Sequence, residues 1–142
     1  MYINIRLHRG GETLDKFTLT REKAVLLIID IQERLVPAML SPNQVIQKTN
    51  ILISIAKKLD IPIMVTEQYP QGLGRTIREI SANLTEAPVF EKKTFSGCTE
   101  EVVSSLNQLK RKKIIVTGME THICVFQTVR DLLSADYQVF VV

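Results

Sequence analysis

The chain has 142 residues, a formal net charge of +3 and a hydrophobic fraction of 45%. This length predicts a single domain with its own core, and the composition excludes a disordered or collagen-like protein. The longest apolar run, Ala24 to Ile29, is far shorter than the roughly 18 residues of a membrane span. So mild a charge gives no support for nucleic-acid binding.

The termini and cysteines indicate a cytoplasmic protein. The first residues, MYINIRLHRGGETLDK, lack the apolar stretch of a secretory signal and include acidic residues. The two cysteines are Cys98 and Cys124, and neither belongs to a CxxC or Cys/His spacing, so we expect no structural zinc site. Two thiols in a chain of this size suit a reducing compartment.

Residues 1–22 read as an N-terminal extension ahead of the main pattern. Three apolar residues alternate there with polar ones, namely Ile3, Ile5 and Leu7. This is the period of a short half-buried strand, and nothing in the sequence indicates what it packs against.

The main pattern begins with AVLLIID, residues 24–30, a continuous apolar run closed by a carboxylate. Such a run is typical of a central strand in a parallel sheet. Ser41 and Pro42 then mark the start of a helix, because Ser is a common N-cap and Pro a common first helical residue. Apolar residues recur at helical spacing as far as Leu59, and residues 61–67 form the next predicted strand.

The middle of the chain is less regular. Residues 71–75 read as a glycine-bearing loop, a short helical turn follows around Ile77 and Ile80, and 87–91 is a short strand. Thr99 can cap a helix that runs to Leu109.

The last part of the chain again alternates strands with a helix. Residues 113–118 form a strand, Thr121 begins a helix, and residues 138–142 form a further strand. Strands that alternate with helices predict one α/β domain, residues 1–142, with a three-layer doubly wound sheet, mostly parallel, and helices on both faces. Sites in such sheets form at the carboxyl ends of the strands, where Asp30, Glu67 and Cys124 lie.

Cys124 lies about one turn into the helix that follows a buried strand. Unpaired amides and the positive partial charge at a helix start lower a thiol pKa and can bind an oxyanion. Such a cysteine is a candidate nucleophile, although most free cysteines are small buried hydrophobes.

Asp30 follows five aliphatic residues, so partial desolvation makes it a candidate base, and a loop or helix cap is the alternative. Lys92 and Lys93 are candidate cations beside the thiol and the carboxylate, unless they are a solvated pair.

The other polar motifs give weaker evidence of a functional site. Cys98 has no helix start before it and reads as a bystander thiol. His122 lies two residues before Cys124, and helical neighbours two apart do not face each other, so we expect a capping or pocket-lining role. The other histidine is His8. Gly72 and Gly74 form a lone GxG, a weak phosphate-loop signal.

Four segments resemble motifs of the isochorismatase-like cysteine hydrolases, in particular the branch of isochorismatase domain-containing proteins. They are LLIIDIQE (26–33), VTEQYPQGLGRT (65–76), FEKKTFS (90–96) and VTGMETHICVFQT (116–128). The resemblance covers about residues 22–142 and implies a Rossmann-like fold.

The resemblance implies a role for each matching residue. Asp30 is the general base, Cys124 the nucleophile, and Lys92 the lysine, because it stands three residues before the aromatic of the Phe95–Ser96 pair. It also implies a cis peptide between Met119 and Glu120, with the amides of Glu120 and Cys124 as the oxyanion hole. Together they imply hydrolysis of a small amide or related carbonyl compound through a thioester.

Two departures from the family pattern shape the expectations. Glu67-Gln68-Tyr69-Pro70 replaces the Asp-x-His metal motif of the nicotinamidases, so we expect no metal and no cofactor. The family also continues beyond the strand at 138–142 with a helix, a strand and a terminal helix. We therefore expect either a shortened chain or a homo-oligomer that covers the open sheet edge.

The substrate stays open at this point. Pocket residues would come from near Gln68, Tyr69, Leu73 and Glu120, and these types fit many small amides. A catalytically silent binding or scaffold protein of the same fold is the alternative. A thiol redox protein is a third hypothesis, and no resolving cysteine lies near Cys124 in sequence. We expect no nucleic-acid or membrane partner.

Overall fold

The computed structural model describes residues 15–142, so the strand predicted at Ile3 to Leu7 lies outside the described part. The strands are β1 (Ala24–Ile29), β2 (Ile63–Gln68), β3 (Val89–Lys92), β4 (Lys113–Gly118) and β5 (Gln138–Val141). The helices are α2 (Pro42–Lys58), α3 (Pro70–Leu73), α4 (Arg78–Ser81), α5 (Glu100–Leu109) and α6 (Phe126–Ser134), with a 3-10 turn η1 (Val36–Ala38) and a π-helical turn η2 (Thr121–Val125).

The five strands form one sheet in the order β3-β2-β1-β4-β5, and each neighbouring pair is parallel. This confirms the predicted α/β class and its parallel sheet. In the register, Ile29 lies opposite both Thr66 and Gly118, and Gln68 lies opposite Lys92. The carboxyl ends of β1 and β4 therefore lie level with each other, and β2 extends two residues beyond them.

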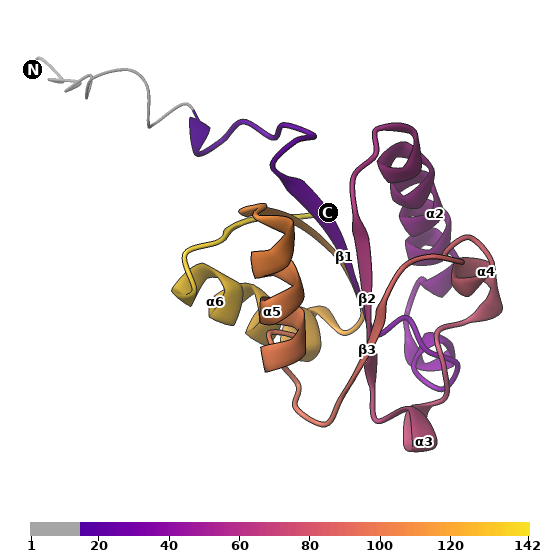
Figure 1. Ribbon diagram of the computed structural model, residues 1–142. Coiled ribbons are helices and arrows are strands. Elements are labelled where there is room, and N and C mark those ends of the chain that lie inside the picture. Colours follow the sequence, from indigo (N-terminus) through magenta and orange to yellow (C-terminus); the bar gives the residue numbers. More distant parts are fainter. Residues whose placement is uncertain (1–14) are drawn as a thin grey trace, which may run out of the picture.

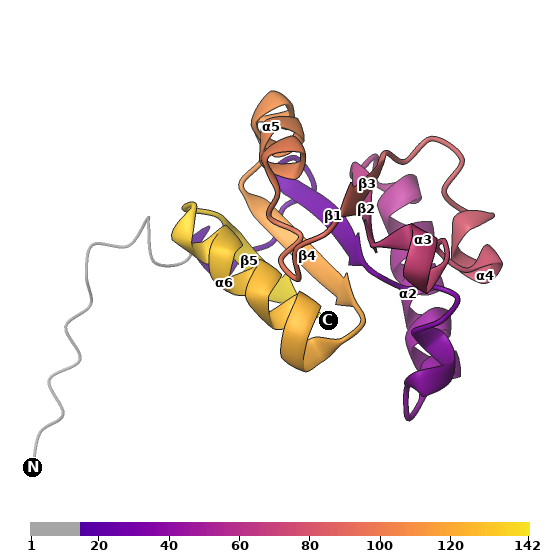
Figure 2. The same cartoon turned by 90° about the horizontal axis from the view of Figure 1, so that it is seen from below.

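Helices cover both faces of the sheet, as the apolar runs predict (Figures 1 and 2). Successive side chains of a strand point to opposite faces, so a strand buried on both sides needs apolar residues throughout. In β1, Leu26 and Ile28 belong to the core under α2 and α4, whereas Val25, Leu27 and Ile29 belong to the core under α5 and α6. All six residues of β1 are buried.

Local details differ from the sequence prediction in two places. Residues 71–73, part of the loop expected at 71–75, belong instead to the single turn α3 (Pro70–Leu73), which begins after Tyr69 adopts a left-handed conformation at φ 37°. Ser41 precedes α2 as expected, but its side chain makes no capping hydrogen bond. Thr99 does cap α5, since its side chain accepts a hydrogen bond from the Val102 amide.

Two cations, the buried Lys113 and the half-buried Arg111, hold the start of the described chain against the sheet. The Lys113 ammonium, at the first residue of β4, donates to the backbone carbonyls of Asp15 and Thr18. The Arg111 guanidinium donates to the carbonyl oxygens of Arg21 at 2.7 Å and Ala24 at 2.9 Å. None of the helices within residues 15–142 combines the length and apolar character that crossing a membrane requires.

Candidate active site

The strand order reverses direction between β1 and β4, because the chain moves outward from β1 to β3 on one side and from β4 to β5 on the other. In an open α/β sheet, ligands bind at this switch point, outside the carboxyl ends of the strands. Asp30 directly follows β1, and Cys124 follows β4 by one turn. Both therefore lie where the fold places a binding site.

Asp30 is wholly buried and has a left-handed backbone at φ 53°. Its amide donates to the Thr66 carbonyl at 3.1 Å, and the Thr66 hydroxyl donates to Oδ1 at 2.8 Å. The other carboxylate oxygen, Oδ2, lies 2.7 Å from the Lys92 ammonium. A buried carboxylate needs such partners, since an unpaired one would be protonated or destabilising.

Lys92, the last residue of β3, is the lysine that reaches this carboxylate. Its Nζ donates to Gln68 Oε1 at 2.7 Å, to the Phe95 carbonyl at 3.0 Å and to the Thr94 carbonyl at 3.2 Å. The neighbouring Lys93 side chain is exposed. Lys92 thus points inward from the end of β3, whereas Lys93, which follows the strand, is exposed.

Gly118 ends β4 at the closest approach of the two central strands. A Cβ at this residue would lie 2.2 Å from the Ile29 carbonyl oxygen, and its φ of 153° is one that other residues rarely adopt. The Met119 amide donates to the same Ile29 carbonyl at 2.8 Å. The Met119–Glu120 peptide bond is cis, as the resemblance implied. These features turn the chain sharply into η2.

Cys124 lies in η2 with 3% of its surface exposed. Its pKa is raised to about 11, first by burial, then by the Asp30 charge and by a hydrogen bond to the Asp30 carboxylate, with a further contribution from Glu120. The Lys92 charge opposes this rise. The low thiol pKa expected from the helix start is therefore wrong. Lys92 lowers the pKa as expected, but burial and Asp30 outweigh its effect.

Two threonines complete the surroundings of Asp30 and Cys124, and neither was predicted from the sequence. Thr66 binds Asp30, and the Thr128 hydroxyl donates to the Cys124 carbonyl at 2.6 Å while accepting from the Gly97 amide at 2.7 Å. Each is wholly buried. The available signal was a polar residue within an apolar segment, which is too common to single out either one.

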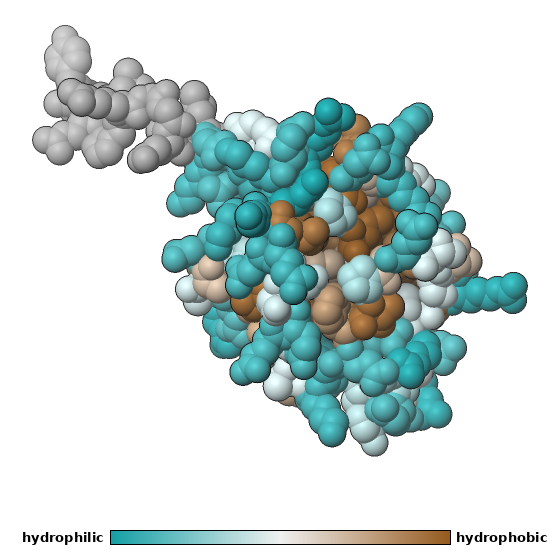
Figure 3. All heavy atoms as spheres, viewed as in Figure 1, coloured by the Kyte–Doolittle hydropathy of each residue, from teal (hydrophilic) through white to brown (hydrophobic). Residues whose placement is uncertain are grey.

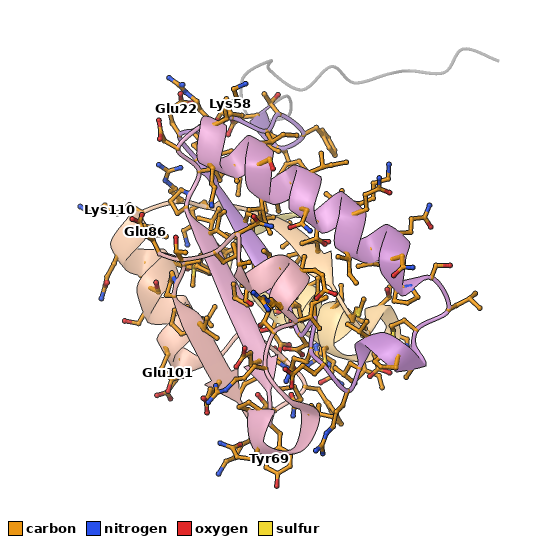
Figure 4. All side chains as sticks on the ribbon, turned by 90° about the vertical axis from the view of Figure 1, so that its right-hand side faces the viewer. Glu22, Lys58, Tyr69, Glu86, Glu101 and Lys110 are labelled. Carbon is orange, nitrogen blue, oxygen red and sulfur yellow. The ribbon has the colours of Figure 1, made fainter. Side chains whose placement is uncertain are left out.

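The four residues expected near the substrate occupy different environments. Gln68 is hydrogen-bonded to Lys92 and to the Lys93 carbonyl. Tyr69 is exposed and lies at the end of β2, away from Glu86 at the other end of the molecule (Figure 4). Leu73 and Glu120 are half-buried. Of these four residues, Glu120 is the one whose negative charge raises the pKa of the Cys124 thiol.

Gln32, just after β1, and Glu67, near the end of β2, hold the neighbouring loops. Buried Gln32 donates to the carbonyls of Gln68 at 2.9 Å and Gly74 at 2.7 Å, and accepts from the Gln68 amide at 2.7 Å. The Glu67 carboxylate accepts from Thr76 and Arg75. Glu67, which the sequence places at the carboxyl end of a strand, therefore fixes the loop after α3.

The remaining sequence candidates lie apart from the ion pair. His122 is exposed in η2, and the side chain that hydrogen-bonds the Cys124 thiol is Asp30. Cys98 is half-buried, and burial raises its pKa, with a smaller effect of Asp131. Within residues 15–142, no group of three or more His, Cys, Asp or Glu side chains is arranged to hold a metal. His8 lies outside the described residues.

A cavity of about 620 Å³ lies at the opposite end of the sheet from Asp30. It opens between the amino ends of β2 and β3, beside hydrophobic surface that gathers between α5 and α4 (Figure 3). Its lining includes Ile61, Ile63, Leu84, Glu86 and Pro88. The cavity is therefore separate from the Asp30–Lys92–Cys124 group.

The fold and this group define a doubly wound α/β protein with a buried cysteine, aspartate and lysine at its switch point. The model of the isochorismatase domain matches residues 24–142. The chain belongs to the isochorismatase family. The expectation drawn from the four sequence motifs is thereby confirmed.

Individual relatives and a solved structure support this family assignment. The chain is 43% identical over 129 residues to the secreted isochorismatase effector Isc1 of Phytophthora sojae, covering 87% of this chain and 61% of that protein. It is 33% identical to isochorismatase domain-containing protein 2 of Xenopus laevis, covering 87% and 60%. A solved structure titled MAR1 ribonuclease from Caenorhabditis elegans superposes with a TM-score of 0.83 at 35% identity, covering 87% and 64%. The chain thus spans about three-fifths of these relatives' lengths.

Proposed function

We propose that the chain is a cysteine hydrolase for a small amide or related carbonyl compound, with Cys124 as nucleophile, Asp30 as base and Lys92 as the cation that holds both. One observation carries the proposal. The buried Asp30 carboxylate contacts both the thiol and the ammonium, with Oδ2 2.7 Å from the Lys92 Nζ. A nucleophile bonded to a base that is itself oriented by a third group is the arrangement that covalent catalysis needs.

The first half of the reaction forms a thioester. Asp30 accepts the thiol proton as Sγ bonds to the carbonyl carbon, and the carbonyl electron pair moves onto oxygen. The amides of Glu120 and Cys124 would hold this oxyanion. The oxyanion then collapses, the carbon–nitrogen bond breaks, and the amine leaves with the proton from Asp30. Because the resting thiol has a pKa near 11, proton transfer accompanies the attack.

The second half restores the enzyme. The water oxygen attacks the thioester carbon while Asp30 accepts a proton from that water. The carbon–sulfur bond then breaks, and the Cys124 thiolate recovers the proton from Asp30. Amide and water become carboxylic acid and amine. The Lys92 charge remains in place throughout, and it offsets the negative charge that passes between Asp30 and Cys124.

The test is a screen of small amides, including acetamide and benzamide, with ammonia release as the readout. Cys124→Ser and Cys124→Ala should abolish release, and the matched variant Cys98→Ala should retain it. An acyl group found on Cys124 by mass spectrometry would support the thioester. Unchanged turnover in either Cys124 variant would refute the scheme.

A second candidate is a protein of this fold that binds without turnover. It is favoured by the 3% exposure of Cys124 and by the raised pKa of its thiol. Alkylation by iodoacetamide, mapped to Cys124, separates the two. A thiol that reacts when small amides are also hydrolysed supports the hydrolase, and an inert thiol with no turnover supports the binding protein.

We also propose that copies of the chain associate. Phe126 and Leu133 of α6 and Val141 of β5 are more than half exposed, at 60%, 54% and 57%. Apolar residues on an edge strand and its covering helix are typical of a protein interface. Sedimentation should show a dimer or larger species that Leu133→Glu dissociates, and a monomer at all concentrations would contradict this.

We also make proposals on the location of the protein and on nucleic-acid binding. We propose a cytoplasmic protein, while one relative is titled a secreted effector. We propose that it binds no nucleic acid, while a structural neighbour is titled a ribonuclease. RNA that is retained at low salt and released at high salt would contradict the second proposal. We propose that the protein needs no metal, and stoichiometric metal found by elemental analysis of the purified protein would contradict this.

A further inference from the structure

Thr128 connects two segments that lie far apart in sequence. It lies on α6, four residues after Cys124, and is wholly buried. Its hydroxyl donates to the Cys124 carbonyl at 2.6 Å and accepts from the Gly97 amide at 2.7 Å. One oxygen atom thus joins the turn that carries the thiol to the loop that follows β3.

That loop also holds the lysine. The Thr94 and Phe95 carbonyls accept from the Lys92 ammonium, at 3.2 Å and 3.0 Å. Gly97 comes two residues later, packed so closely that a Cβ there would lie 3.2 Å from Thr128 Oγ1 and 3.3 Å from Thr66 Cγ2. Glycine allows this approach, so the position of the loop depends on the contact with Thr128.

The contacts close into a ring. The Cys124 thiol bonds Asp30, Asp30 pairs with Lys92, and Lys92 donates to the Phe95 carbonyl. The chain continues from Phe95 to Gly97, whose amide bonds Thr128. We infer that Thr128 is a positioning residue that fixes the lysine loop relative to the cysteine turn. This inference rests on the proposed hydrolase for its catalytic meaning, although the ring itself does not depend on the substrate.

A threonine hydroxyl that bonds the carbonyl four residues before it is common within helices and by itself means little. The second bond is the informative one. The Gly97 amide is buried against Thr128, and a buried amide requires an acceptor. Without the hydroxyl, the loop must move so that this amide finds another partner. Movement of the loop displaces the two carbonyls that hold Lys92.

The experiment compares Thr128→Val, Thr128→Ser and the wild-type chain. Valine keeps the shape and removes the hydroxyl, and serine keeps the hydroxyl. Thr49→Val is the matched control, since Thr49 of α2 is also wholly buried and its hydroxyl lies 3.4 Å from that of Thr117 in β4. The rate of alkylation by iodoacetamide is measured for Cys124 between pH 7 and pH 11.

A displaced Lys92 lowers the thiol pKa less, so the Cys124 profile should move to higher pH. We expect Thr128→Val to react about threefold more slowly at pH 9, equivalent to a shift of about half a pH unit. Thr128→Ser and Thr49→Val should follow the wild-type profile. Superposable profiles for folded Thr128→Val and wild type would overturn the inference.

Two further measurements keep the inference testable if Thr128→Val does not fold. The Gly97 amide of the wild-type chain should exchange slowly with solvent, and exchange at the rate of an open loop would overturn the inference. Gly97→Ala crowds the same hydroxyl from the loop side and should slow Cys124 alkylation in the same way.

The inference and the proposed function fail separately. Absence of amide turnover, with the shifted profile of Thr128→Val, removes the hydrolase and leaves the positioning role. Amide turnover that is equal in wild type and Thr128→Val, with equal alkylation, removes the positioning role and leaves the hydrolase.

Discussion

The Lys92 ammonium lies 2.7 Å from the Asp30 carboxylate, and neither side chain is exposed to solvent. The two residues come from β3 and from the end of β1, so β2 lies between the strands that carry them. An ion pair buried in this way is costly to break, because removal of one partner leaves the other charged and unpaired.

Lys92→Met should therefore destabilise the fold by about 3–5 kcal/mol in urea unfolding, the cost of an unpaired buried charge. It should also raise the Cys124 pKa further, since the Lys92 charge now lowers it. Lys93→Met is the matched control, as the neighbouring side chain is exposed. Equal unfolding midpoints for the two variants would show that the pair does not stabilise the fold.

Asp30→Asn should separate thiol acidity from catalysis. Asp30 raises the Cys124 pKa by its charge and by accepting the thiol proton in a hydrogen bond, so asparagine should lower that pKa. Asparagine also tolerates the left-handed backbone of this residue. Cys124 should then be alkylated faster at pH 9 while amide hydrolysis is lost. The exposed Asp136→Asn is the control, and hydrolysis that survives in Asp30→Asn would exclude Asp30 as the base.

Stability should fall above pH 9 because of Cys124. The thiol ionises near 9 when unfolded and near 11 when folded, so between these values the unfolded chain has released the proton that the folded chain retains. The contribution is fully present below pH 9 and is lost as the pH rises through 11. The unfolding free energy of wild type relative to Cys124→Ser should decrease by about 1.4 kcal/mol per pH unit in this interval. A difference independent of pH would contradict the raised pKa.

Gly118→Ala should destabilise the protein by more than about 2 kcal/mol, because its Cβ would meet the Ile29 carbonyl oxygen at 2.2 Å and the backbone is strained. Gly72→Ala is the comparison. Its Cβ would meet the ring of Tyr69, a half-exposed side chain that can move aside. Thermal unfolding of the two variants measures the difference, and similar midpoints would mean that the two strands can separate at Gly118.

The sequence predicts what depends on local pattern. The apolar run at 24–30 predicts a central strand, and the approach of Asp30 to Cys124 follows because parallel strands end at the same edge. The thiol pKa could not be predicted in this way, since its direction depends on burial and on a carboxylate from another strand. The Thr128–Gly97 contact joins residues 31 positions apart, and no periodic pattern in the sequence predicts it.

The three central residues do not share one segment of the chain. Asp30 and Cys124 are held by the two innermost strands, whereas Lys92 ends β3, a four-residue strand at the rim that is paired on one side. Rim strands are the first parts of a sheet to open locally. Fraying of β3 would leave the Asp30 carboxylate buried without its cation, so the same ion pair also holds this rim strand on the sheet.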